Sequence, residues 1–148
     1  MSEIEPAQLN NWDRRILQTL EVAARDVAPV TGARMAAAVA IRGTIISMGN
    51  NSLKSHPFQN RFGKNSESMF WHAETHAVHN FLRKHLVSEL ERSTLYVVRV
   101  KPPRSAGVDW SVAMARPCRG CTRCIWDHGI PRVIYSNAQG GYSCEGSV

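Results

Sequence analysis

Residues that can bind a metal and move a proton recur at short spacing in two segments of the chain. His72 and Glu74 form a His-x-Glu pair, and Cys118 and Cys121 form a Cys-x-x-Cys pair directly after Pro117. One imidazole and two thiolates are a three-ligand zinc set that leaves the fourth tetrahedral position open, as catalytic zinc sites do. The sequence therefore predicts a zinc ion held by His72, Cys118 and Cys121 and available for chemistry.

Glu74 is the residue that we expect to move protons at this site. A carboxylate beside a zinc-activated water can accept its proton and deliver it elsewhere. The two cysteines are expected in the first turn of a helix, whose positive end favours thiolate over thiol. The pattern indicates hydrolytic chemistry with Glu74 as acid and base.

Other metal-site interpretations fit less well. Cys124 extends the motif to Cys-x-x-Cys-x-x-Cys, which together with Cys144 is typical of iron–sulfur ligation. Because Cys124 lies nearly two helical turns beyond Cys118, we expect it to be a buried apolar residue. His72 and His76 have the spacing of a zinc-protease helix, but the acid does not stand where that motif requires it.

Periodicity predicts the elements that must position these residues. In chain order they are a helix over 12–28 ended by Pro29, strands over 33–41 and 44–48 joined by an Arg42-Gly43 turn, a helix over 72–86, a strand over 94–100, a helix from Pro117 to about His128 and a strand over 132–136. Residues 49–70 are expected to form a long loop, and loops of this length usually carry function. Strands interleaved with helices favour an α/β sheet covered by helices.

The motifs and their order resemble those of the zinc-dependent cytidine and deoxycytidylate deaminase superfamily, whose signature is His-x-Glu with Pro-Cys-x-x-Cys. The resemblance includes the segments HAETHAVHNFL, TLYVVRV and ARPCRGCTRCIWDHGIPRVIYSN. The length of 148 residues fits a single domain over residues 1–148, and the resemblance implies a three-layer α/β/α sandwich with a central mixed five-stranded sheet. The ending YSNAQGGYSC predicts a final antiparallel hairpin. The resemblance further implies attack of water on the amidine carbon of a base, with Glu74 protonating the ring nitrogen and then the departing ammonia.

The resemblance also indicates where the substrate would bind. An asparagine after the second strand contacts the sugar in this family, which favours Asn51, with Asn50 as the alternative. Ala73, inside the His-x-Glu segment, is counted with these residues. Trp71 and Trp110 are candidates for stacking on the base, because both lie near the expected metal ligands in the sequence.

Charge suggests a phosphate-bearing partner. The 148 residues carry a formal net charge of +6, and the excess of basic residues lies in the second half. Arg116 and Arg119 flank the cysteine pair and are candidates for binding a substrate phosphate. The N-terminus lacks the pattern of a signal peptide, and no segment is apolar for long enough to span a membrane. We therefore expect a reducing cytoplasmic environment and no membrane partner.

The predicted function is conversion of a cytosine nucleoside or nucleotide to its uracil form, with deoxycytidine monophosphate as the first choice. The segment Lys54-Ser55-His56-Pro57-Phe58-Gln59 resembles one found in phage-encoded deaminases related to deoxycytidylate deaminases. One alternative is a deaminase of single-stranded DNA or RNA, or of a modified or different base. Another is a non-catalytic zinc-binding module, against which Glu74 argues. The resemblance also implies a homo-oligomer.

Overall fold

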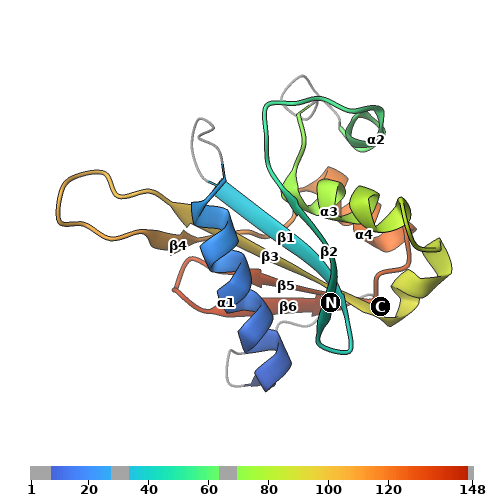
Figure 1. The fold of residues 1–148 in the computed structure, drawn as a ribbon, viewed down its shortest axis with the longest axis horizontal. Helices are drawn as coiled ribbons and strands as arrows, with labels where there is room; N and C mark the ends of the chain where they lie inside the picture. Colours follow the sequence, from blue (N-terminus) through green and yellow to red (C-terminus); the bar gives the residue numbers. More distant parts are fainter. Residues whose placement is uncertain (1–7, 28–33, 64–69, 147–148) are drawn as a thin grey trace.

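The computed structural model describes residues 8–27, 34–63 and 70–146, which form a mixed β-sheet between two layers of helices (Figure 1). Helix α1 covers one face of the sheet, and helices α3 and α4 cover the other. The elements are α1 (Asn11–Arg25), β1 (Arg34–Ile41), β2 (Thr44–Asn50), α2 (Pro57–Asn60), α3 (Ala73–Leu82), a 3-10 helix (Val87–Arg92), β3 (Ser93–Lys101), β4 (Ser111–Ala113), α4 (Arg119–Asp127), β5 (Arg132–Ser136) and β6 (Tyr142–Gly146). The predicted α/β/α sandwich is confirmed.

The sheet has the order β2-β1-β3-β5-β6, and all neighbours in it are antiparallel except the parallel pair β3 and β5. These five strands are the predicted mixed sheet, and the predicted antiparallel final hairpin is present as β5 and β6. The short strand β4 was not predicted and pairs with the end of β3. The Ser136 hydroxyl donates to the Ala113 carbonyl oxygen (2.7 Å) and accepts from the Arg99 N–H (3.1 Å), which joins β5 to β3 and β4.

Helix α1 begins at a reciprocal cap. The Asn10 side-chain oxygen accepts from the Asp13 N–H (2.8 Å), and the Asp13 carboxylate accepts from the Asn10 N–H (3.1 Å). The residues that it buries recur at helical spacing and include Ile16, Leu17, Leu20 and Ala24. The helix ends at Arg25, before the predicted end at residue 28, and Pro29 lies outside the described residues.

The β1–β2 hairpin follows the prediction from its two-residue turn. Arg42 and Gly43 both have positive φ, at 52° and 79°, as a tight hairpin turn of this length requires. A Cβ on Gly43 would lie 2.6 Å from the Trp12 ring, so α1 also restricts this position to glycine. The alanines of β1 are buried on both faces, with Ala36 facing α1 and Ala37 facing α3, and their small side chains let both helices approach.

Helix α3 packs closely on the edge strand β2. A Cβ on Gly49 would lie 2.3 Å from the backbone nitrogen of Ala77, so the two backbones are nearly in contact. The Asn80 side chain donates to the Met48 carbonyl oxygen (2.8 Å), and the Asn50 N–H donates to His76 Nδ1 (3.1 Å). This end of β2 therefore has its outward backbone groups bonded to α3.

The predicted long loop and the following helix differ from expectation in detail. The loop contains the short helix α2, and an isolated bridge pairs Ser55 with Phe70, while residues 64–69 lie outside the description. Helix α3 ends at Leu82 rather than near residue 86. Leu86 is 68% exposed, so no apolar face continues the helix, and a 3-10 helix leads into β3 instead.

The apolar core has two halves, one on each face of the sheet. Val97 packs with Phe81 on the face of α3 and α4, whereas Val98 packs with Leu20 on the face of α1. The side chains of β3 thus alternate between the halves, as successive residues of a strand do. Among the described residues, no helix is long and apolar enough to cross a lipid bilayer.

Candidate metal centre and active site

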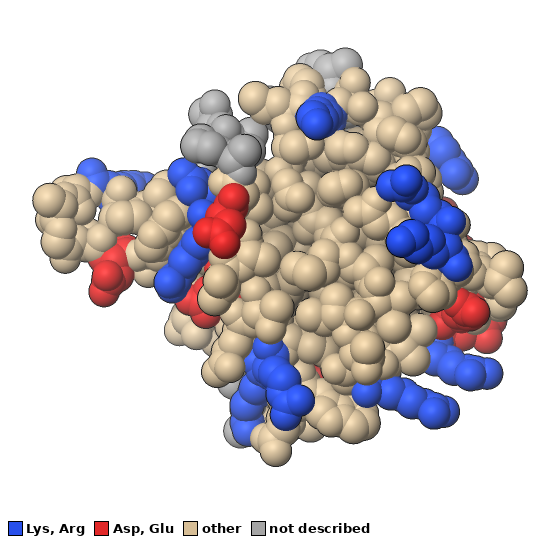
Figure 2. Space-filling model, viewed as in Figure 1, with Lys and Arg blue, Asp and Glu red and all other residues tan. Residues whose placement is uncertain are grey.

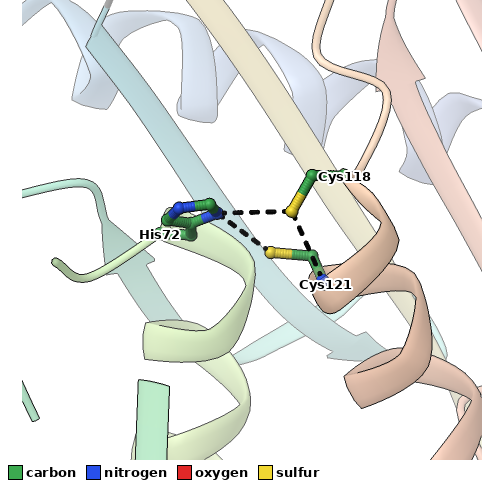
Figure 3. Close-up of side chains that lie close together, drawn as sticks. All are labelled: His72, Cys118 and Cys121. Carbon is green, nitrogen blue, oxygen red and sulfur yellow. Dashed lines mark hydrogen bonds between the residues drawn. The ribbon is translucent and has the colours of Figure 1, made fainter. Parts of the chain in front are cut away.

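The three predicted metal ligands come together where helices α3 and α4 begin (Figure 3). His72 is the N-cap residue of α3, and Cys118 is the N-cap residue of α4, with Cys121 in the first turn. Both helices start beside the carboxyl ends of the parallel strands β3 and β5. This is the edge at which open α/β sheets generally bind ligands.

The distances between the donor atoms fit a zinc ion. His72 Nδ1 lies 3.2 Å from Cys121 Sγ and 3.6 Å from Cys118 Sγ. The three donor atoms all lie within 4.8 Å of one another. Tetrahedral zinc with ordinary bond lengths places a nitrogen and a sulfur ligand about 3.6 Å apart. One imidazole and two thiols can therefore hold the metal from one side and leave a position for a further ligand.

The start of α4 favours negative charge on the sulfur atom of Cys118. Cys118 Sγ accepts from the Cys121 N–H at 3.5 Å, in the role that a serine or aspartate oxygen has at other helix caps. The Cys121 side chain hydrogen-bonds to that of Cys118 and lowers the pKa of the Cys118 thiol to about 3, with a further contribution from His72. The pKa of His72 is raised, first by its hydrogen bond with Cys118. The surroundings of Cys118 therefore favour the thiolate form, which is the form that binds a metal.

Glu74 is a buried carboxylate next to this set. Its residue is 3% exposed, and burial raises the pKa of its carboxyl group. Oε1 has no hydrogen-bond partner in the structure, a costly state for a buried polar atom. Among the described residues, the only other buried side-chain atom in this state is Arg99 Nε. An orphaned carboxylate oxygen beside three metal-binding side chains fits a metal with a water ligand.

The other cysteines do not join the set. Cys124 is 1% exposed, as expected of a buried apolar residue, and burial raises the pKa of its thiol to about 12. Cys144 lies in β6 and packs with the core on the α1 face, the opposite side of the sheet. In the described part of the chain, His72, Cys118 and Cys121 are the one group of this kind. This geometry leaves no place for an iron–sulfur cluster.

Three of the expected substrate residues lie at the start of α3 or at the end of β2 beside it. Ser52, just after Asn51, donates its N–H to the Trp71 carbonyl oxygen (3.2 Å), which fixes this segment beside His72. Asn51 Oδ1 accepts from the Met35 N–H (2.8 Å), and the Asn50 side chain donates to the Asn51 carbonyl oxygen (3.0 Å). Ala73, the first residue of α3, is fully buried.

The two tryptophans lie in different surroundings. Trp71 is 7% exposed, and its ring stacks on His56 with centroids 4.8 Å apart and lies 4.9 Å from His76. Trp110 instead packs against the core on the α1 face, under the Arg34 guanidinium at 4.9 Å. The structure therefore does not bring Trp110 to the face of the sheet that carries the metal ligands.

Arg116 and Arg119 lie on the outer flank of α4. Arg116 forms an ion pair with Glu145 of β6 (2.8 Å), and its side chain is 57% exposed. A pocket of about 360 Å³ is lined by Arg116, Pro117, Arg119, Thr122, Arg123, Trp126 and Glu145. The basic side chains are thus gathered beside the cysteine segment, on its solvent side.

Sequence reasoning missed two residues near the site, Gln59 and Arg99. Gln59 Oε1 accepts from the His72 N–H (3.1 Å), although the two residues belong to different elements. Arg99 pairs with Met35 across β1 and β3, and Met35 is joined to Asn51, so the three residues form one row of the sheet. Strand alternation turns this row toward α3 and α4. The apolar run around Arg99 gave no signal of this position.

Residues 10–137 match the family of the cytidine and deoxycytidylate deaminase zinc-binding region. The chain belongs to this family. As a member it is a zinc-dependent deaminase, an enzyme that hydrolyses a carbon–nitrogen bond. A comparison with curated protein sequences finds no match.

Solved structures of deaminases share the fold. Cytidine deaminase from Burkholderia pseudomallei superposes with a TM-score of 0.61 at 16% identity, over 93% of each chain. The apo dCMP deaminase of the cyanophage S-TIM5 gives a TM-score of 0.59 at 18% identity, over 88% of this chain and 86% of that one. Its complex with dCMP and dUMP gives 0.57 at 17% identity, over 88% and 85%. At these identities the likeness concerns the fold.

Proposed function

We propose that this deaminase acts on a free cytosine nucleotide, with deoxycytidine monophosphate as the first choice, and forms the uracil nucleotide and ammonia. The observation that carries the reaction type is Glu74, a buried carboxylate with an unpartnered oxygen beside His72, Cys118 and Cys121. The dCMP deaminase of cyanophage S-TIM5, which has a similar fold, supports the choice of substrate. The proposal treats the chain as a single catalytic domain.

In this proposal His72, Cys118 and Cys121 hold the zinc. When bound, zinc activates a water molecule for attack on the amidine carbon of the base. Both thiols must remain reduced for this role, which places the protein in a reducing compartment such as the cytoplasm. All four cysteines are free in the described structure, in agreement with this requirement.

Glu74 moves the protons. Its Oε1 has no bond to break and is free to take a proton from the attacking water. The carboxyl group gives this proton to the ring nitrogen of cytosine, then takes the second proton of the same water and gives it to the amino group, which leaves as ammonia. The oxygen of the water stays on the base as the new carbonyl oxygen, so the products are uracil and ammonia.

The row of the sheet formed by Asn51, Met35 and Arg99 gives the substrate site a polar and a cationic group. We assign Asn51 to the sugar, with Asn50 supporting it through its bond to the Asn51 carbonyl oxygen. Arg99 Nη1 makes only a long contact to the Met114 carbonyl oxygen (3.4 Å), and its Nε is unpartnered. A guanidinium with free donors suits the phosphate of a nucleotide.

The remaining predicted residues have smaller roles in the proposal. Ala73 and Trp71 form the wall behind the base, since both are buried at the start of α3. Arg116 and Arg119 lie on the flank of α4, where they can attract an anionic substrate from solution. Trp110 faces the other side of the sheet, and self-association of the protein remains a prediction.

Nucleic acid is the alternative substrate. Single-stranded nucleic acid is usually bound along a continuous basic groove with aromatic platforms. On the face shown in Figure 2, lysines and arginines gather in separate groups with a broad uncharged area between them. The absence of a continuous basic groove among the described residues of this face favours a small substrate.

The test is ammonia release from deoxycytidine monophosphate by the purified protein, beside deoxycytidine and a cytosine-containing oligonucleotide. We expect release from the nucleotide that depends on Glu74 and stops on zinc removal. Release only from the oligonucleotide would replace the proposed substrate. A protein that binds zinc but releases no ammonia from any cytosine compound would favour a different base or the non-catalytic zinc module.

The role of Arg99 has its own test. In Arg99→Met we expect kcat/KM for the nucleotide to fall about 10- to 100-fold, the effect of losing a charged hydrogen bond, with little change for deoxycytidine. Arg92→Met is the matched control, since Arg92 is exposed at the opposite end of β3. Equal losses on both substrates would contradict phosphate binding by Arg99.

A further inference from the structure

The residues His56–Gly63, here called the α2 segment, lie between the two helices that carry the metal ligands. On one side Gln59, which is 2% exposed, accepts the His72 N–H on its Oε1 at 3.1 Å. The Thr75 hydroxyl contacts the same oxygen and also lies 3.1 Å from the His72 carbonyl oxygen. The Gln59 amide oxygen thus contacts the His72 N–H directly, and it also contacts the Thr75 hydroxyl, which lies beside the His72 carbonyl oxygen.

His72 depends on this contact because of its place at the start of α3. Its backbone is extended, with φ −89° and ψ 154°, and its side chain makes no cap hydrogen bond, since the imidazole faces the two sulfur atoms. In a capping box the N–H of such a residue is bonded by a glutamate or glutamine in the same helix. Here the equivalent residue is Thr75, and the acceptor comes from Gln59 in α2 instead.

The other side of the α2 segment contacts α4 between its two cysteine ligands. A Cβ on Gly120 would lie 2.1 Å from the Phe62 carbonyl oxygen, so the backbones touch at this point. The Arg123 guanidinium donates to the Arg61 carbonyl oxygen at 3.0 Å and lies over the Phe62 ring at 5.6 Å. The α2 segment therefore contacts both the backbone of His72 and the first turn of α4, which carries Cys118 and Cys121.

We propose that Gln59 is a positioning residue of the metal centre, which orients His72 by accepting its backbone N–H while the α2 segment rests on Gly120. In this proposal Gln59 acts through His72 and is not itself a metal ligand. The inference rests on the zinc site of the proposed function, not on its substrate. Outer groups that orient a metal ligand typically change metal affinity 10- to 100-fold.

The test compares two variants of Gln59 that differ in the acceptor. Gln59→Met keeps an unbranched side chain of similar length and removes the acceptor, whereas Gln59→Glu retains an oxygen at the same position. Gln18→Met, at an exposed position of α1, controls for the exchange itself. Zinc affinity is measured by competition with a chelator, and ligand geometry by the visible absorption spectrum of the cobalt(II)-substituted protein.

We expect zinc binding to weaken about 10- to 100-fold in Gln59→Met, with altered cobalt bands, and to remain within about threefold of wild type in Gln59→Glu and Gln18→Met. Unchanged affinity and spectrum in Gln59→Met would overturn the proposal, as would equal losses in both Gln59 variants. If Gln59→Met does not fold, Gln59→Asn, which keeps an amide but draws its oxygen away from the His72 N–H, is compared with Gln59→Glu in the same way. Inactivity of the wild-type protein toward nucleotides would contradict the proposed substrate and leave these metal affinities to decide the role of Gln59.

Discussion

Each face of the sheet buries a carboxylate, but the two carboxylates differ in their hydrogen bonding. On the α1 face, Asp13 is 1% exposed and accepts from the Asn10 N–H (3.1 Å), the Tyr96 hydroxyl (2.5 Å) and Arg132 (3.4 Å). On the face of α3 and α4, Glu74 is 3% exposed and its Oε1 has no partner. Nearly equal burial is therefore combined with full bonding in one case and an orphaned atom in the other.

The difference fits a structural role for Asp13 and the catalytic role that we propose for Glu74. A buried charge that is fully hydrogen-bonded holds the elements around it together, and removing one partner leaves the others exposed to an apolar interior. A buried polar atom without a partner lowers stability and is retained where chemistry needs a free group. The comparison predicts that variants on the α1 face alter stability, and that variants on the other face alter metal binding and catalysis.

The largest effect is expected from a pair of buried cysteines on opposite faces. Cys121→Ala should lose zinc and all deaminase activity, because two protein ligands rarely hold the metal. Cys144→Ala removes the same atom from the α1 face and should retain zinc and activity. Metal content and ammonia release would be measured for both variants. Loss of metal in both would contradict the assignment of the metal site to the face of α3 and α4.

The next largest effect concerns Glu74 itself. Glu74→Gln should lower the rate of ammonia release about 10²- to 10⁴-fold, the usual contribution of a general acid and base. Its free energy of unfolding should stay equal or rise, because the substitution removes a buried carboxylate with an unpartnered oxygen. Rates and denaturant unfolding test this together, and a large loss of stability would show that Glu74 has a structural role.

On the α1 face the equivalent substitution should have the opposite profile. Asp13→Asn weakens the cap of α1 and a hydrogen bond from Arg132, so we expect a loss of about 2–4 kcal/mol in the free energy of unfolding. Zinc content and the rate at a temperature where the protein is folded should change little. A specific loss of rate without loss of stability would contradict the structural assignment.

The smallest effect is expected at Tyr96. Its hydroxyl donates to Asp13, and burial raises the pKa of this phenol, so the group stays protonated as a donor. Tyr96→Phe removes one of several hydrogen bonds and should cost about 1 kcal/mol of stability. A cost larger than that of Asp13→Asn would mean that Tyr96, and not the carboxylate, organises this network.

The metal ligands and the helix starts that carry them could be predicted from the sequence, because both are encoded in short motifs. His72 and Cys118 begin helices, and Cys121 follows within one turn, so their geometry is local and readable from spacing. The order of helices and strands along the chain was predicted from periodicity, and their alternation indicated the α/β class. The apolar patterns also placed α1 and the first hairpin with small errors at their ends.

The remainder depended on contacts between distant segments. Gln59 reaches His72 only through the path of the loop that contains α2, and that path has no periodic signal. Arg99 belongs to an apolar strand, and its importance lies in the row that it shares with Met35. Trp110 was placed near the metal by sequence distance, but its side chain, like that of Val112 in β4, packs against the core on the α1 face.

The bonds between α3 and the end of β2 also limit how these molecules can aggregate. The Met48 carbonyl oxygen and the Asn50 N–H point away from β1 and would be available to another strand if Asn80 and His76 did not bond them. Free edge strands are the usual starting points for the addition of foreign strands and for fibril growth. At this end of β2 the bonds to α3 block such growth, whereas β6, at the other end of the strand order, pairs only with β5 among the described strands.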